Sequence, residues 1–359
     1  MAKLNALEIH ESLNYLNAVI YSPLSYTYHY PQLSLATYMA SIEHIKKIKN
    51  VRIFTSSPNS TYHPFIPNVY FTKLGFNFFQ VIQDHVSNIY FTNQLKNVFI
   101  HPELKLLNQL MLKHNLYSLF TDPYYQRFEQ ACEACITDFK VQSQLRSFKS
   151  TLQSWNTKFT YANTSYDKFI SFISRETDIF EVHSILIQRH LRSGIEPQFD
   201  DPAFCDLPAS TITEEKAKKI ISAVWRNRKN NDVLGILSKR ETDISNTSTI
   251  RLIFFVKRTD SDLIEFNQTC LFKTLEPFLT VHDLDSVSIG KTISSMNVDI
   301  VPLFQGQHCN YYNLSQIHIG NRLTILKSHI VISDMWLRIN NLSSTVAIER
   351  GSTEYYRGK

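Results

Sequence analysis

The sequence predicts an α+β protein, in which a helical and mixed N-terminal half precedes a palm-like or ferredoxin-like domain with a β-α-β-β-α order. Three observations lead to this expectation. Hydrophobic residues make up 43% of the 359 residues, which is typical of a chain with a packed core. Apolar residues recur at helical spacing between residues 102 and 154, and strand-like runs alternate with amphipathic helices after Tyr161. We therefore expect a largely helical region over 1–160, a sheet domain over 161–345 and a C-terminal tail over 346–359.

The elements of the first half follow from residue spacing and β-propensity. A helix is expected at 33–49, strands at 51–54 and 68–71, and helices from 102 to about 120 and from 122 to about 154. Cys132 and Cys135 form a C-x-x-C inside the last of these helical patterns. Because no second C-x-x-C accompanies them, buried thiols on a helix face are favoured over a metal site or a redox pair.

The ordered series of elements after Tyr161 carries the fold prediction. We expect a short helix at 166–174, a strand at 182–188, a helix at 213–230, strands at 233–237 and 250–256, and a helix near 265–279. A long loop with Gly194, Pro197, Pro202 and Pro208 precedes the helix that Thr213 opens. Its apolar positions recur at helical spacing and would pack on the sheet: Ala217, Ile220, Ile221, Val224 and Trp225. Further strands are expected at 299–304, 323–326 and 329–332.

Composition and motifs exclude several classes of function. The chain has eight glycines and neither a G-x-x-x-x-G-K-[ST] nor a G-x-G-x-x-G motif, so nucleotide-dependent chemistry of those kinds is disfavoured and no cofactor is expected. The start lacks the order of a signal peptide, and no apolar run reaches membrane-spanning length. Five cysteines, an odd number, are typical of reduced thiols. We expect a cytoplasmic protein without a membrane partner.

Positive charge is concentrated in one segment. Residues 211–258 contain eleven basic and five acidic residues, an excess of +6, whereas the whole chain carries +5. The run from Trp225 to Asn231 combines cations with Asn amides, which suits phosphate oxygens and base edges. The alternative is a solvated helix end, where the helix dipole favours cations in any case. The candidate nucleic-acid-binding residues are Lys216, Lys219, Arg226, Asn227, Arg228, Lys229, Asn230, Lys239, Arg240 and Arg251.

Motifs for catalysis are largely missing. The sequence has no H-E-x-x-H, G-x-S-x-G or zinc-finger spacing, and we assign no catalytic or metal-ligating residue. Gln316 and His318 would share one face if they lie on a strand, as two metal ligands need, and Tyr355 or Tyr356 could serve as a nucleophile. Ordinary surface histidines and a frayed tail are the favoured interpretation.

Residues from about 161 to 280 resemble the replication proteins of filamentous-phage-like and related integrated elements, which are similar to rolling-circle initiators. The resemblance lies in the helix before Val182, the basic helix at 213–230 and the strands at 233–241 and 249–255. In that family the last strand begins with a His-hydrophobic-His metal motif, whereas this sequence has Thr249 and Arg251 at the matching places. The resemblance therefore implies a palm fold and contact with DNA, but no nicking.

Together these features predict a non-enzymatic DNA-binding accessory protein of a mobile genetic element, acting in replication, transposition or target-site recognition. The expected partner is DNA, with other subunits of a mobile-element machinery as further partners. Two alternatives stay open: a metal-dependent nicking nuclease of the rolling-circle type, and a protein-protein scaffold without a nucleic-acid role.

Overall fold

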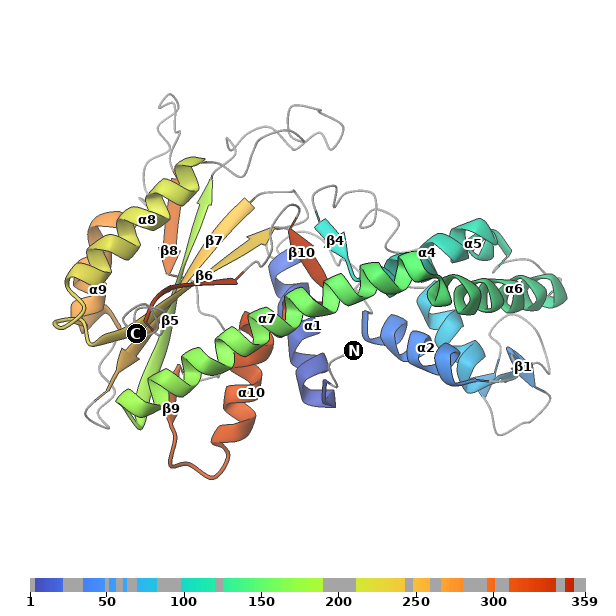
Figure 1. Cartoon of the computed structure of the whole chain (residues 1–359), viewed down its shortest axis with the longest axis horizontal. Helices are drawn as coiled ribbons and strands as arrows, with labels where there is room; N and C mark the ends of the chain where they lie inside the picture. Colours follow the sequence, from blue (N-terminus) through green and yellow to red (C-terminus); the bar gives the residue numbers. More distant parts are fainter. Residues whose placement is uncertain are drawn as a thin grey trace.

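A six-stranded antiparallel sheet forms the centre of the C-terminal half of the protein (Figure 1). The computed structural model describes residues 4–21, 35–48, 52–55, 61–62, 70–82, 98–119, 125–189, 211–242, 248–258, 266–279, 296–300, 310–339 and 346–351. The strands are β5 (Ile179–Arg189), β6 (Val233–Thr242), β7 (Ser248–Lys257), β8 (Met296–Ile300), β9 (Tyr311–Asn313) and β11 (Val346–Arg350). Their order is β11-β6-β7-β5-β8, with β9 also paired to β5. The predicted α+β class is confirmed.

One face of this sheet is covered by helix α8 (Thr211–Arg226). Alternate residues of a strand point to opposite faces, so Leu252 and Phe254 of β7 face α8 while Ile253 and Phe255 face away. The α8 side of the contact is formed by Ala217, Ile220, Ile221 and Val224, as their spacing predicts. Trp225 also packs here but is only partly buried. Beside α8 lie η2 (Phe266–Gln268), α9 (Cys270–Leu275) and η3 (Glu276–Phe278), where one helix was expected.

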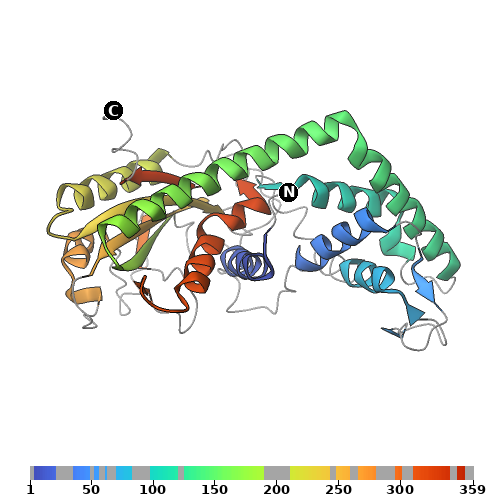
Figure 2. The ribbon, with the colours of Figure 1, turned by 60° about the horizontal axis from the view of Figure 1, so that its bottom comes forward.

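The other face of the sheet packs against α7 (Arg146–Glu176), α10 (Ile319–Ile330), α1 (Ala6–Tyr21) and η4 (Ile332–Met335). The ring of Phe169 on α7 meets that of Phe255 edge-on, with centroids 4.9 Å apart. The approach of α7 requires a glycine in β6, because a Cβ at Gly235 would lie 2.5 Å from the Phe169 ring. In the N-terminal half of α7, Trp155 donates from Nε1 to the carbonyl of Met335 at 3.0 Å. Figure 2 shows α7 running from the sheet to the N-terminal helices.

The N-terminal half is mostly helical. It contains α2 (Leu35–Lys47), a helix at 73–82, α4 (Pro102–Lys113), α5 (Leu116–Leu119) and α6 (Tyr125–Gln144). Three two-residue strands, β1 (Phe54–Thr55), β2 (Thr61–Tyr62) and β3 (Tyr70–Phe71), form a small sheet, and β4 (Val98–Ile100) pairs with β10 (Leu337–Ile339). One hydrophobic cluster extends from Tyr15 through this half to Phe255 and Trp336. Among the described residues, no helix combines the length and the apolar character needed to cross a bilayer.

Several element boundaries differ from the expectation. The helix expected at 166–174 is the end of the 31-residue α7, because Trp155, Phe159, Tyr166, Phe169 and Ile173 continue one buried stripe at helical spacing. The expected division at residue 160 therefore falls inside a helix.

The C-terminal elements also differ from the expectation. The strands expected at 323–326 and 329–332 lie in α10 and η4, and the region assigned to a tail begins with strand β11. Leu323, Leu326 and Ile330 are three and four residues apart, the spacing of one helix face. The strand expected at 299–304 is β8, which ends at Ile300. The loop with Gly194 and its prolines lies outside the described residues.

Candidate nucleic-acid interface

The outer side of α8 carries the cations of the predicted basic helix. Lys218, Lys219 and Arg226 are exposed on the side opposite the apolar contact with the sheet. Lys216 is partly buried, and its ammonium lies 5.5 Å from the centroid of the Phe278 ring. The exposed α8 cations therefore face solvent along the length of the helix.

The turn after α8 adds the next group of donors. Residues 227–230 are all exposed, and they include the predicted Asn227, Arg228, Lys229 and Asn230. The guanidinium carbon of Arg228 lies 4.7 Å from the centroid of the Trp225 ring. The carbonyl of Ala223 accepts from Nδ2 of Asn227 at 3.3 Å and from the backbone N–H of the same residue at 3.4 Å. Arg226 and Arg228 also suit this position because the helix dipole is negative there.

Asn231 joins this turn to two other elements. Its side chain is buried, its Nδ2 lies 3.5 Å from the carbonyl of Val224, and its Oδ1 accepts from the hydroxyl of Thr274 on α9 at 3.1 Å. The next residue, Asp232, has a left-handed φ of 52°, and its carbonyl accepts from the backbone N–H of Lys257 at 2.7 Å. The turn is thereby fixed beside the end of β7 and beside α9.

These links bring one further exposed cation to the turn, because Lys273 precedes Thr274 on α9. The backbone of Lys257 also lies beside the turn, but its side chain points to the opposite face of the sheet: Val256 packs with α8, and Phe180, the β5 partner of Lys257, packs on the α7 side. We define the basic surface as Arg226, Arg228, Lys229 and Lys273. In the part of the chain that the structure describes, none of these four cations forms an ion pair with a carboxylate. Lys273 reaches this surface only through tertiary packing.

Arg240 lies apart from the basic surface. Its Nη2 is 2.6 Å from Oε1 of Glu214, in the first turn of α8, so its charge is already paired. Exposed acids are also present on this side of the protein, at Glu215, Asp232 and Glu276. Of these, Asp232 is next to the basic turn in sequence.

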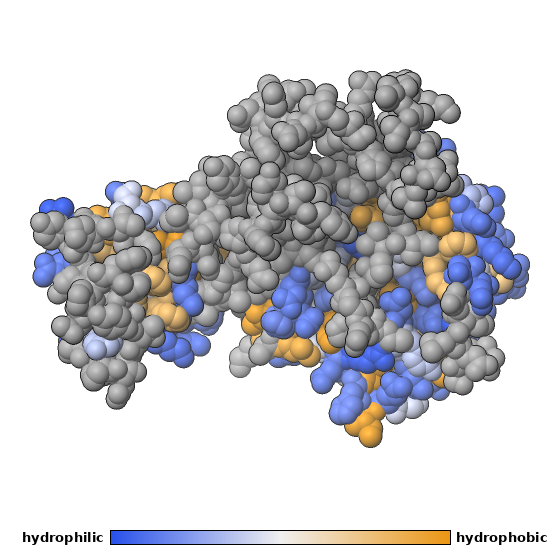
Figure 3. Space-filling model, turned by 180° about the vertical axis from the view of Figure 1, so that it is seen from behind, coloured by the Kyte–Doolittle hydropathy of each residue, from blue (hydrophilic) through white to orange (hydrophobic). Residues whose placement is uncertain are grey.

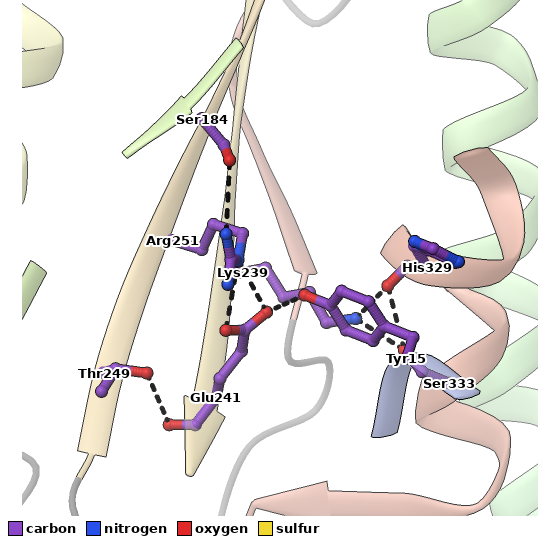
Figure 4. A network of polar contacts seen from close by, with 8 residues as sticks. All are labelled: Tyr15, Ser184, Lys239, Glu241, Thr249, Arg251, His329 and Ser333. Atoms are coloured by element: carbon purple, nitrogen blue, oxygen red, sulfur yellow. Dashed lines mark hydrogen bonds and ion pairs between the residues drawn. The ribbon is translucent and has the colours of Figure 1, made fainter. Parts of the chain in front are cut away.

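Lys239 and Arg251 correct the prediction, because both are buried in the interior (Figure 4). Only 3% of Lys239 and 5% of Arg251 is exposed. Nε of Arg251 donates to both carboxylate oxygens of Glu241, at 3.1 and 3.2 Å, and Nη1 donates to the hydroxyl of Ser184 at 3.3 Å. The hydroxyl of Tyr15 on α1 donates to the same carboxylate. The two cations lie on the sheet face covered by α1, α7 and α10, so they cannot reach a nucleic acid.

Lys239 occupies the neighbouring part of this network. Its ammonium donates to the hydroxyl of Ser333 at 2.6 Å and to the carbonyl of His329, and it lies 4.2 Å from the centroid of the Tyr15 ring. Burial lowers the pKa of Lys239 to about 8, although nearby Asp334 and Glu241 act in the opposite direction. Burial also acts to lower the pKa of Arg251, but Glu241 and Tyr15 hold it above its ordinary value. The guanidinium therefore stays charged.

The residues considered for metal-dependent chemistry do not form a site. Gln316 and His318 are exposed in the turn that precedes α10, so the expected strand alternation is wrong. Thr249 is buried with Arg251, and its hydroxyl lies 3.4 Å from the carbonyl of Glu241. No group of three or more His, Cys, Asp or Glu side chains suited to a metal occurs within the described ranges. Tyr355 and Tyr356 lie outside them.

Cys132 and Cys135 are buried on α6, as their place in a helical pattern predicted. Burial raises the pKa of Cys135 to about 12 and that of Cys132 well above its ordinary value. Both are therefore protonated near neutral pH, which is the unreactive form of a thiol.

No protein-family model, no curated protein and no solved structure matches the chain.

Proposed function

We propose that the protein is a non-enzymatic DNA-binding accessory protein of a mobile genetic element, which contacts DNA phosphates through the basic surface. The observation that carries this proposal is the gathering of four exposed cations from α8, from the turn after it and from α9 beside the buried Asn231. The antiparallel sheet with α8 on one face is compatible with the palm-like arrangement that the resemblance implies, and the mobile-element role rests on that resemblance.

A solvated helix end explains only part of this arrangement. The dipole of α8 favours Arg226 and Arg228 near its C-terminus without any ligand. It does not explain Lys273, which belongs to α9 and is brought to the turn by the contact of Asn231 with Thr274. Because like charges repel, a concentration of unpaired cations is typical of a surface that meets an anionic partner.

The salt dependence of binding tests the proposal. Each phosphate contact made by a cation releases counterions, so the logarithm of the affinity for duplex DNA falls with the logarithm of salt by about 0.9 per contact. Changing Arg226, Arg228 and Lys229 together to alanine should reduce the magnitude of this slope by roughly 2–3. The matched control changes Lys149, Lys158 and Lys168 to alanine. These substitutions remove the same charge from exposed positions on α7. An unchanged slope in the first variant would favour the scaffold interpretation.

A second substitution separates DNA binding from a solvated helix end. Lys273→Ala should reduce the magnitude of the slope by about 0.9 if its ammonium meets a phosphate, whereas Lys257→Ala, on the opposite sheet face, should leave the slope unchanged. A helix end without a ligand predicts no change. Asn227 and Asn230 are expected to act differently: alanine at a base-reading position should relax sequence preference by about 1–3 kcal/mol and leave the slope unchanged.

A further inference from the structure

Rings at the centre of both sheet faces are buried, and rings at the margins are partly exposed, among them Phe172 of α7. Phe169, Phe180 and Phe255, on the face covered by α7, are fully buried. In the α8 and α9 layer, four rings are partly exposed: Trp225, Phe266, Phe272 and Phe278. Partial exposure is ordinary at the edge of a core, so the groups beside each ring decide whether it can bind a ligand. Figure 3 shows hydrophobic residues among the hydrophilic ones at the end of the molecule that carries the sheet.

Cations accompany two of these rings. Arg228 lies 4.7 Å from the Trp225 ring, and Lys216 lies 5.5 Å from the Phe278 ring. Lys216 and Trp225 are nine positions apart on α8, which corresponds to about 14 Å along the helix axis. Exposed Lys218 and Lys219 lie between them in the sequence. The layer therefore combines cations of α8 and its following turn with the rings of Trp225 on α8 and Phe278 on η3.

We propose that this layer binds single-stranded DNA, with the cations on the phosphates and one unpaired base stacked on the Trp225 and Arg228 pair. This inference rests on the proposed function and names its substrate. The bases of a duplex are already paired and stacked, so a partly exposed ring gains nothing from them. An unpaired base offers a free π-face, and both an indole and the planar guanidinium of an arginine can stack on it.

Fluorescence gives a direct test, because Trp225 is the one partly exposed residue among the three tryptophans. Trp155 and Trp336 are buried, at 9% and 1% exposure. The probes are a twelve-nucleotide oligo-dT, an abasic strand with the same number of phosphates, and a twelve-base-pair duplex. We expect oligo-dT to quench the fluorescence and to bind about five- to 150-fold more tightly than the abasic strand, the factor for one stacked base.

Three variants assign the effect to the stacked pair. Trp225→Leu should remove the quenching and bring oligo-dT to the affinity of the abasic strand, without changing the salt slope. Trp225→Phe retains a ring and should keep most of the preference. Arg228→Lys retains the charge but loses the planar group, so the preference should fall. The last two remove less buried volume than Trp225→Leu, so they remain informative if that variant does not fold.

The outcomes distinguish this inference from the function on which it rests. Equal affinities of oligo-dT and the abasic strand, with unchanged fluorescence, would overturn base stacking, while a slope that falls when the cations are removed would still support DNA binding. If none of the three probes binds, both proposals are wrong.

Discussion

The buried ammonium of Lys239 makes the stability of the protein depend on pH. The pKa of Lys239 is about 8 in the folded chain, compared with an ordinary value of 10.5. Below pH 8 the amine is protonated in both states, and the folded state carries the full cost of the buried charge. Between pH 8 and 10.5 the folded chain releases a proton that the unfolded chain keeps, so stability rises with pH. The pKa difference of about 2.5 units, at about 1.36 kcal/mol per unit, corresponds to an increase of about 3 kcal/mol in the unfolding free energy.

The assay is urea unfolding at pH values from 7 to 10.5, followed by circular dichroism, for the natural chain and for Lys239→Met. Other groups titrate in this range in both proteins, among them Tyr15, whose pKa burial raises. The quantity to follow is therefore the unfolding free energy of the natural chain minus that of the variant. We expect this difference to rise by about 3 kcal/mol across the range. A constant difference would show that the lysine is not buried as a charged group.

Two further predictions concern buried polar groups. Arg251→Met should destabilise the protein by about 3–5 kcal/mol, because it leaves the Glu241 carboxylate buried without its cation, and adding Glu241→Leu should restore most of the loss in a double-mutant cycle measured by urea unfolding. The hydroxyl of Tyr166 is buried and has no hydrogen-bond partner among the described residues. Tyr166→Phe should therefore raise the unfolding free energy by about 1 kcal/mol. A decrease of similar size in the unfolding free energy would contradict this prediction.

The elements that could be predicted from the sequence are those with long, unambiguous periodicity. The spacing of Ile220, Ile221 and Val224 placed α8 on the sheet, and strands β5, β6 and β7 were found from continuous runs of β-branched and aromatic residues. Short apolar runs gave errors, because four residues such as 323–326 do not distinguish a strand from a turn of helix. For these residues the strand period was expected instead of the helical one, so α10 was not predicted.

The candidate site was predicted in part, because a charge count does not report burial. Lys239 and Arg251 raised the positive charge of the segment although both are internal. One signal was available: Lys239 and Glu241 have the same parity on β6 as the buried Leu237, so alternation assigns all three to one face. An acidic and a basic residue on the inner faces of neighbouring strands indicate an internal ion pair. Lys273 could not be assigned from the sequence, because its place depends on the contact between Thr274 and Asn231.

The length of α7 limits how the protein can be divided for experiments. Its 31 residues span about 46 Å, and the same helix contributes Trp155 near η4 and Phe169 against the sheet. A fragment that ends near residue 160 would expose the cut end of a helix and lose half of its buried stripe, and the complementary fragment would lose the other half. Neither fragment would retain a complete core. Binding studies on the basic surface therefore require the whole chain, not an isolated sheet domain.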